Sequence, residues 1–109
     1  MTFGERIREL RKANDLSQRE LAAQTGINFT YISRIENGKL EFSEFPSEAT
    51  IHKLSDALDG DEEELLLMAK KIPVAIRERV LQRPDVFRRI ARLDDATLDH
   101  LMTTLEEDE

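Results

Sequence analysis

The stretch from Leu16 to Lys39, LSQRELAAQTGINFTYISRIENGK, places the strongest constraint on how this 109-residue chain can fold. Ser17 is followed three positions later by Glu20, which is the spacing of a capping box, so a helix is predicted to begin at about Gln18. Gly26 stands where the chain must leave that helix with a positive φ. The stretch therefore predicts two short helices joined by a glycine-centred turn.

The second helix of this stretch is predicted to have one apolar and one polar face. Tyr31, Ile32 and Ile35 recur at helical spacing and are expected to point inward. Asn28 is suited to cap the start of the helix, and Gly38 to close its end. The opposite face offers groups that suit base edges and phosphates. It carries Asn28, Thr30, Ser33, Arg34 and Asn37, with Phe29 near its start.

With these residues the segment resembles the XRE, or Cro/C1-type, helix-turn-helix of phage repressors and small bacterial regulators. The resemblance covers roughly residues 3 to 69. It implies an all-α fold, with a five-helix, lambda-repressor-like DNA-binding domain over residues 1–70. The residues that carry it are Arg8-Glu9-Leu10-Arg11, Leu16-Ser17-Gln18, Glu20-Leu21-Ala22, Gly26, Ile32-Ser33, Ile35-Glu36-Asn37-Gly38-Lys39 and the later Pro46-Ser47.

In this family the second helix of the motif enters the major groove of DNA, while the first crosses the backbone. The resemblance places Phe29, Thr30 and Arg34 where family members read bases, although many members carry a polar residue in place of Phe29. Arg34 is suited to a bidentate contact with guanine, and Phe29 to packing against a thymine methyl group. The other expected DNA-binding residues are Gln18, Asn28, Asn37 and Lys39 at phosphate positions, Ser33, and Tyr31 as a core residue or a phosphate donor.

Several of these side chains also have structural alternatives. Phe29 can be buried instead of exposed, and Arg34 can pair with Glu36 or Asp56 on a solvated face. Glu36 itself is expected to be structural. An ion pair with a basic residue such as Arg11 would secure the first helix of the domain against the recognition helix.

The net charge of −7, with a pI near 4.9, has the wrong sign for a typical DNA-binding protein. The acidic excess is uneven: residues 1–58 carry −1, residues 59–69 carry −5, residues 70–92 carry +6 and residues 93–109 carry −7. The DNA-binding part is thus near neutral, and tight binding is expected to need a dimer on a palindromic operator. The local basic face expected there consists of Arg6, Arg11, Arg19, Arg34 and Lys39.

Caps and turns divide the rest of the first 70 residues. Helices are predicted from Thr2 to Ala13, from Glu48 to Leu58 between a Ser47 cap and a stop at Gly60, and from Glu62 to Lys71 after a capping box of Asp61 and Glu64. Between them, the loop LEFSEFP contains two aromatic residues. We expect that Phe42, Phe45 or both tuck under the loop, and the alternative is a contact with a partner.

Residues 71–109 contain too many apolar side chains for a solvated tail. Pro73 and Pro84 bracket VAIRERVLQR, and Asp85 and Asp94 are each predicted to start a further helix. A helix as short as the last one cannot bury its apolar face alone. We expect a C-terminal helical dimerisation segment, and the alternative is packing within one chain. Its expected contact residues are Val86, Phe87, Ile90, Leu98, Leu101, Met102 and Leu105.

This tail, including LLLMAKKIP and RPDVFRRIARLDD, is similar to small regulators encoded beside zinc metallopeptidases of the repressor-cleaving type, some of them in phage-defence operons. The resemblance implies a homodimeric repressor that is inactivated when such a peptidase cuts its C-terminal half.

Other functional classes fit the sequence less well. An enzyme is not expected, because the chain has two histidines, no cysteine, no HExxH and no phosphate-binding glycine loop. No cofactor or metal is expected either, since the run from Glu62 to Glu64 occupies helix-start positions that favour acids. The serious alternative, which the acidic charge favours, is an antitoxin or protein-interaction module that acts by binding a protein partner.

Location is the last inference from the sequence. No apolar run approaches the roughly 20 residues needed to cross a bilayer, and the N-terminal MTFGERIREL lacks the apolar region of a signal peptide. A cytoplasmic protein without a membrane partner is expected. A small regulator of this kind most simply acts as a repressor that occludes a promoter, such as that of its own operon.

Overall fold

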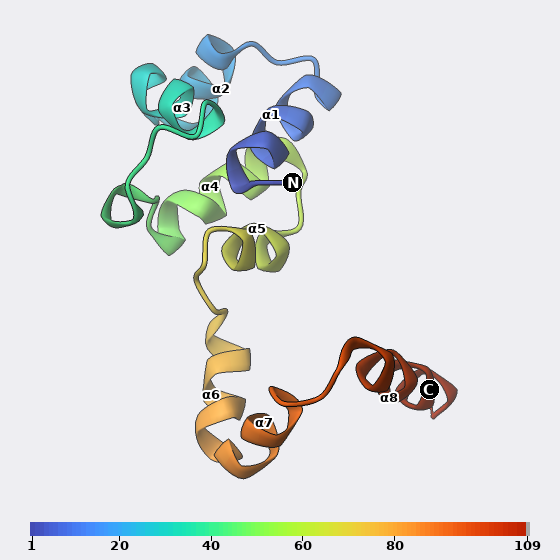
Figure 1. Cartoon of the computed structure of the whole chain (residues 1–109). Helices are drawn as coiled ribbons and strands as arrows, with labels where there is room; N and C mark the ends of the chain where they lie inside the picture. Colours follow the sequence, from blue (N-terminus) through green and yellow to red (C-terminus); the bar gives the residue numbers. More distant parts are fainter. Residues whose placement is uncertain (109) are drawn as a thin grey trace. The chain divides into compact units, whose positions relative to one another are not determined.

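The computed structural model describes residues 1–108, with Phe42 described by its backbone alone. These residues are all-helical and contain no strand (Figure 1). They divide into two units, Met1–Pro73 and Val74–Glu109. The helices are α1 (Phe3–Ala13), α2 (Gln18–Thr25), α3 (Phe29–Glu36), the short 3-10 helix η1 (Phe42–Glu44), α4 (Glu48–Leu58), α5 (Glu62–Met68), α6 (Val74–Gln82), α7 (Pro84–Ile90) and α8 (Asp95–Glu107).

The turn between α2 and α3 forms as the sequence predicts. Ser17 accepts a hydrogen bond from the Glu20 backbone N–H, and the Glu20 carboxylate accepts one from the Ser17 N–H, so both halves of the capping box are present. Gly26 ends α2 with φ of 73°. The Asn28 side chain then caps α3 by accepting hydrogen bonds from two backbone N–H groups. Local capping chemistry therefore fixes both ends of the turn.

One predicted helix end in this unit was right and one was wrong. α4 stops at Leu58 as predicted, although the left-handed residue that closes it is Asp59, with φ of 51°, instead of Gly60. An aspartate tolerates this conformation better than most residues because its short side chain can bond locally. α5 stops at Met68, short of Lys71. Asp61 caps α5 as predicted.

The core of the first unit is a cluster of aliphatic side chains from all five of its α-helices. The fully buried members are Ile7, Leu21, Ile32, Ile51, Leu54, Leu58 and Leu65. Phe45 packs against Phe3 at its edge, with ring centroids 6.1 Å apart, so this loop aromatic tucks under the loop as expected. The side chain of Phe42 lies outside the described part of the chain. The core holds α1, α2 and α3 together with α4, which contacts α2, and α5, which contacts α4 (Figure 1).

The second unit has no comparable core. No residue of α6, α7 or α8 is buried. Asp94 caps α8 as predicted, accepting a hydrogen bond of 2.8 Å from the Thr97 N–H. The predicted start at Asp85 was wrong, because Pro84 occupies the first turn of α7 and its fixed φ and missing N–H suit that position.

A membrane-spanning helix would need greater length and apolar character than any helix found within residues 1–108.

Candidate nucleic-acid interface

The surface of α3 divides as its sequence pattern predicts. Ile32 and Ile35 are buried in the core, whereas Thr30 is exposed at the N-terminal end of the helix. The other expected DNA-binding residues are exposed (Asn28, Asn37 and Lys39) or partly buried, and they lie on α3, beside it or at the start of α2. They are Gln18, Asn28, Phe29, Tyr31, Ser33, Arg34, Asn37 and Lys39.

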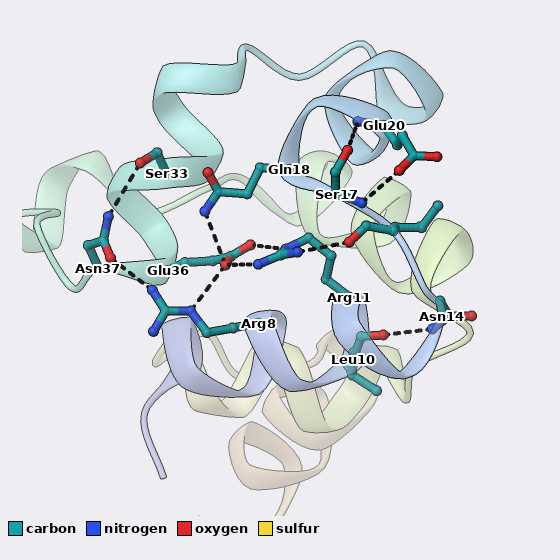
Figure 2. A network of polar contacts seen from close by, with 11 residues as sticks. Arg8, Leu10, Arg11, Asn14, Ser17, Gln18, Glu20, Ser33, Glu36 and Asn37 are labelled. Carbon is teal, nitrogen blue, oxygen red and sulfur yellow. Dashed lines mark hydrogen bonds and ion pairs between the residues drawn. The ribbon is translucent and has the colours of Figure 1, made fainter.

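Glu36 anchors α3 to the two helices before it (Figure 2). Its side chain is buried, and each of its carboxylate oxygens accepts a 2.8 Å hydrogen bond from the Arg11 guanidinium. Arg8 Nε donates to the same carboxylate at 3.3 Å, and Gln18 Nε2 at 3.2 Å. The predicted Arg11–Glu36 ion pair is therefore confirmed, and it links α1, α2 and α3.

The hydrogen bonds to Glu36 decide its protonation state. Burial raises the pKa of the Glu36 carboxyl, but the hydrogen bonds from Arg11, Gln18 and Arg8 outweigh burial and leave the pKa below its ordinary value. Glu36 is thus an anion at neutral pH, surrounded by donors. Within residues 1–108, no buried side-chain nitrogen or oxygen lacks a hydrogen-bond partner.

Gln18 and Asn37 are held by this network at its solvent side. One hydrogen of the Gln18 amide goes to Glu36, and the second remains for an outside acceptor such as phosphate. Asn37 accepts a 2.8 Å hydrogen bond from Arg8 and donates one to Ser33 (Figure 2). Both side chains are oriented before any ligand arrives, which lowers the entropy lost on binding.

Arg34 has a partner that the sequence did not suggest. Its Nη2 lies 2.7 Å from Glu44 Oε2 and donates to the Lys39 carbonyl at 3.3 Å. The pairings with Glu36 or Asp56 proposed as alternatives were wrong, because Glu44 in η1 supplies the carboxylate. A guanidinium can donate two parallel hydrogen bonds from either of two edges, Nε with Nη2 or Nη1 with Nη2, so Nη2 takes part in both. A bidentate contact with guanine therefore requires Arg34 to release Glu44 or the carbonyl.

Glu44 is itself fixed by the loop. The Glu41 backbone N–H donates to its carboxylate at 3.0 Å, and this bond, followed by the one from Arg34, lowers the pKa of the Glu44 carboxyl. The Tyr31 hydroxyl donates to the Glu44 carbonyl. Tyr31 thus fastens the loop to α3, and partial burial, followed by the nearby Glu44 charge, raises the pKa of its hydroxyl.

Phe29 is not fully buried, and its ring contacts another side chain. It is partly exposed, and the Arg19 guanidinium carbon lies 4.4 Å from the centre of its ring. This is a cation–π contact across the start of α2 and α3. Arg19 therefore shares the surface with Phe29, and it brings a positive charge beside the expected base-reading end of α3.

The basic face is smaller than the sequence suggested. Arg6 pairs with Glu64 and Glu9, and Arg11 pairs with Glu36, so neither offers a free charge. In the described part of the chain, Arg19 and Lys39 are exposed and have no carboxylate partner.

Two contacts with consequences for this surface, Arg8–Glu36 and Arg34–Glu44, were not foreseen from the sequence. The position of Arg8 three residues before Arg11, on the same face of α1, could have indicated the first of them.

Comparison with known proteins agrees with this geometry. A family model described as helix-turn-helix, of the XRE type, matches residues 7–65, from within α1 to within α5. The chain belongs to this helix-turn-helix family.

The curated relatives support the same assignment. The helix-turn-helix chain is 43% identical over 79 residues to the HTH-type transcriptional regulator RghRB of Bacillus subtilis, covering 70% of this chain and 55% of the relative. It is 43% identical over 68 residues to the HTH-type transcriptional repressor RghR of the same organism, covering 62% and 48%. It is 50% identical over 42 residues to the control protein C.MunI of a Mycoplasma species, covering 38% and 57%.

The chain spans about half the length of these relatives. No solved structure matches it significantly.

Proposed function

We propose that this helix-turn-helix chain is a sequence-specific DNA-binding transcriptional regulator without enzymatic activity. The observation that carries the proposal is the polar, exposed N-terminal end of α3, held in place by the buried Glu36 network. A helix presented in this way is suited to enter the major groove. The similarity to RghR, which is named a transcriptional repressor, favours repression over activation.

The contacts on DNA follow from where the side chains lie. Thr30, Phe29 and Arg34 would face base edges, with Arg34 exchanging Glu44 for guanine. Gln18, Asn28, Asn37 and Lys39 would contact phosphates, with Ser33 beside them. The half-exposed Arg34–Glu44 pair contributes at most about 1 kcal/mol, so a two-bond contact with guanine can replace it.

Loss of Thr30 and Arg34 together is expected to weaken the preference for specific DNA. The double variant Thr30→Ala, Arg34→Ala should lose about 1–3 kcal/mol of discrimination at the base pair that Arg34 reads. Fluorescence anisotropy at fixed salt, with the chain's own upstream DNA and a scrambled duplex, measures this difference.

The matched control is Arg77→Ala, Thr103→Ala, which removes the same two residue types from exposed positions on α6 and α8. It should bind like the unchanged chain. Equal weakening of the single variant Arg34→Ala on both duplexes would show that Arg34 contacts only phosphate. No preference by the unchanged chain at any salt concentration would favour the antitoxin or interaction-module alternative.

A homodimer on a palindromic operator completes the proposal. Residues 1–58, with a net charge of −1, offer few free positive charges, so a single copy gains little from counterion release. Two half-sites would add their contacts. The exposed apolar residues Val86, Leu101, Met102 and Leu105, with Phe87, Ile90 and Leu98 beside them, would supply the dimer contacts. We expect a cytoplasmic protein that represses its own operon.

We further propose that a zinc metallopeptidase, of the kind found in phage-defence operons, inactivates the chain by cutting its C-terminal half. The helices there are joined by exposed residues, including Arg83 and Asp94, which a peptidase can reach. Co-incubation with the peptidase should yield an N-terminal fragment that ends near Arg83 or Asp94 and binds the operator at least tenfold more weakly. An intact chain under inducing conditions, judged by mass spectrometry, would contradict this step.

A further inference from the structure

The second unit combines a basic groove with an acidic helix. The groove, of about 1070 Å³, lies over α7 and the first turns of α8. Four arginines line it together with apolar side chains. The residues used below are Arg88, Arg89, Arg92, Val86, Ile90 and Leu101. Residues 94–109, by contrast, contain seven acidic residues and no lysine or arginine.

The acidic residues of α8 follow a regular spacing. Asp95, Asp99 and Glu106 recur at intervals of four and seven residues, which places them on one stripe of the helix. This stripe borders the apolar face of α8, where Leu101, Met102 and Leu105 are 40%, 56% and 59% exposed. The helix therefore presents apolar side chains with a negative edge, which complements an apolar groove with a positive edge.

These opposite charges do not meet within one chain. In the described residues of the second unit, the ion pair present is Arg83 with Asp85, and no carboxylate of α8 pairs with Arg88, Arg89 or Arg92. No residue of α6, α7 or α8 is buried. Since units below about 40 residues usually need oligomerisation, a metal or disulfides to be stable, this unit is expected to need a partner beyond its own three helices.

We propose that the partner is α8 of a second copy of this chain. Each α8 lies in the α7–α8 groove of the other copy, with Asp99 and Glu106 facing the partner's arginines. The exchange is reciprocal, as a twofold-symmetric dimer requires. The inference rests on the proposed dimer and goes beyond it by assigning the occupant of the groove and the charges that select it.

Charge reversal on each side of the contact tests this arrangement. One variant carries Arg89→Glu, Arg92→Glu, so that both its groove and its α8 are negative. The other carries Asp99→Arg, Glu106→Arg, so that the stripe of α8 formed by positions 95, 99 and 106 becomes positive, like its groove. In the reciprocal arrangement each variant repels itself and attracts the other, because a mixed pair has two contacts of opposite sign. The control Arg77→Glu, Arg79→Glu makes the same charge change on α6, outside the groove.

Sedimentation velocity of the full-length chains at about 0.1 M salt measures the outcome. We expect dimers for the unchanged chain and the α6 control, at least tenfold weaker dimerisation for each groove or α8 variant alone, and dimers again in their equimolar mixture. Helicity by circular dichroism should recover in the mixture as well.

Two results would overturn the inference. If both charge-reversed variants alone dimerise like the unchanged chain, the copies associate elsewhere, and the proposed dimer survives without this contact. If the unchanged chain is monomeric at 100 µM, the dimer fails too. The preference for specific DNA is tested separately, by comparing the Thr30→Ala, Arg34→Ala variant with the unchanged chain. That test does not depend on either result.

Discussion

Replacing Glu36 by glutamine is expected to lower the free energy of unfolding of the first unit by about 3 kcal/mol. Glutamine has nearly the same shape, but its NH₂ group would face the Arg11 guanidinium, donor against donor. Arg11 would be left mostly buried without a counter-charge, and Gln18 and Arg8 would lose a charged acceptor. Urea denaturation followed by circular dichroism measures the loss.

The pH dependence separates this effect from a simple loss of packing. Because the folded pKa of Glu36 lies below its unfolded value of about 4.3, its stabilisation is fully present above that pH. It is lost as the pH falls through the folded pKa. The Glu36→Gln variant should therefore lose less stability on acidification than the unchanged chain.

Glu41→Gln is the matched control, because the Glu41 side chain is exposed in the same unit. It should change the stability by no more than about 0.5 kcal/mol at any pH. If the Glu36→Gln chain were as stable as this control, the buried network would make no net contribution to the free energy of unfolding.

Gly4→Ala is expected to destabilise the first unit by about 3 kcal/mol, although alanine favours helices by about 1 kcal/mol over glycine. A Cβ at this position would lie 2.1 Å from the Ile35 carbonyl oxygen and 3.3 Å from the Glu36 Cα. Both are backbone atoms, so no side chain can rotate away. α1 would have to move off α3, and thermal denaturation should show the loss directly.

Gly38→Ala is the control that separates the steric clash at Gly4 from the backbone strain of placing alanine at a positive φ. Gly38 has φ of 66°, but a Cβ there would meet no atom within 4 Å. Its replacement should therefore cost only about 1–2 kcal/mol. If Gly4→Ala were tolerated better than Gly38→Ala, the approach of α1 to α3 would have to be looser than the structure shows.

Local chemistry made much of the fold predictable. The starts of α2, α3, α4, α5 and α8 follow from one capping side chain each, and such a cap lies within three residues of the N–H groups that it satisfies. The Arg11–Glu36 pair was also predictable, because a charge on the inner side of the recognition helix needs a partner on a neighbouring helix. The residue that closes α4 is Asp59 and not the predicted Gly60, because aspartate can adopt the left-handed conformation that glycine usually supplies at a helix end.

The contacts that could not be predicted join distant segments without any local signal. Glu44 reaches Arg34 only because η1 folds back along α3, and the sequence of this loop resembles no standard turn. The crowding at Gly4 depends on the distance between two helices, which no pattern in either one reveals. The residues of the expected DNA surface are thus a prediction from the sequence, whereas the contacts that restrain them came from the structure alone.

The bond between Tyr31 and Glu44 has an optical consequence. The chain contains one tyrosine and no tryptophan, so its intrinsic fluorescence arises from a single side chain on α3. Emission from a phenol depends on its hydrogen-bonding partner. The recognition helix therefore carries an unlabelled reporter of whether the loop that holds Arg34 is closed or open.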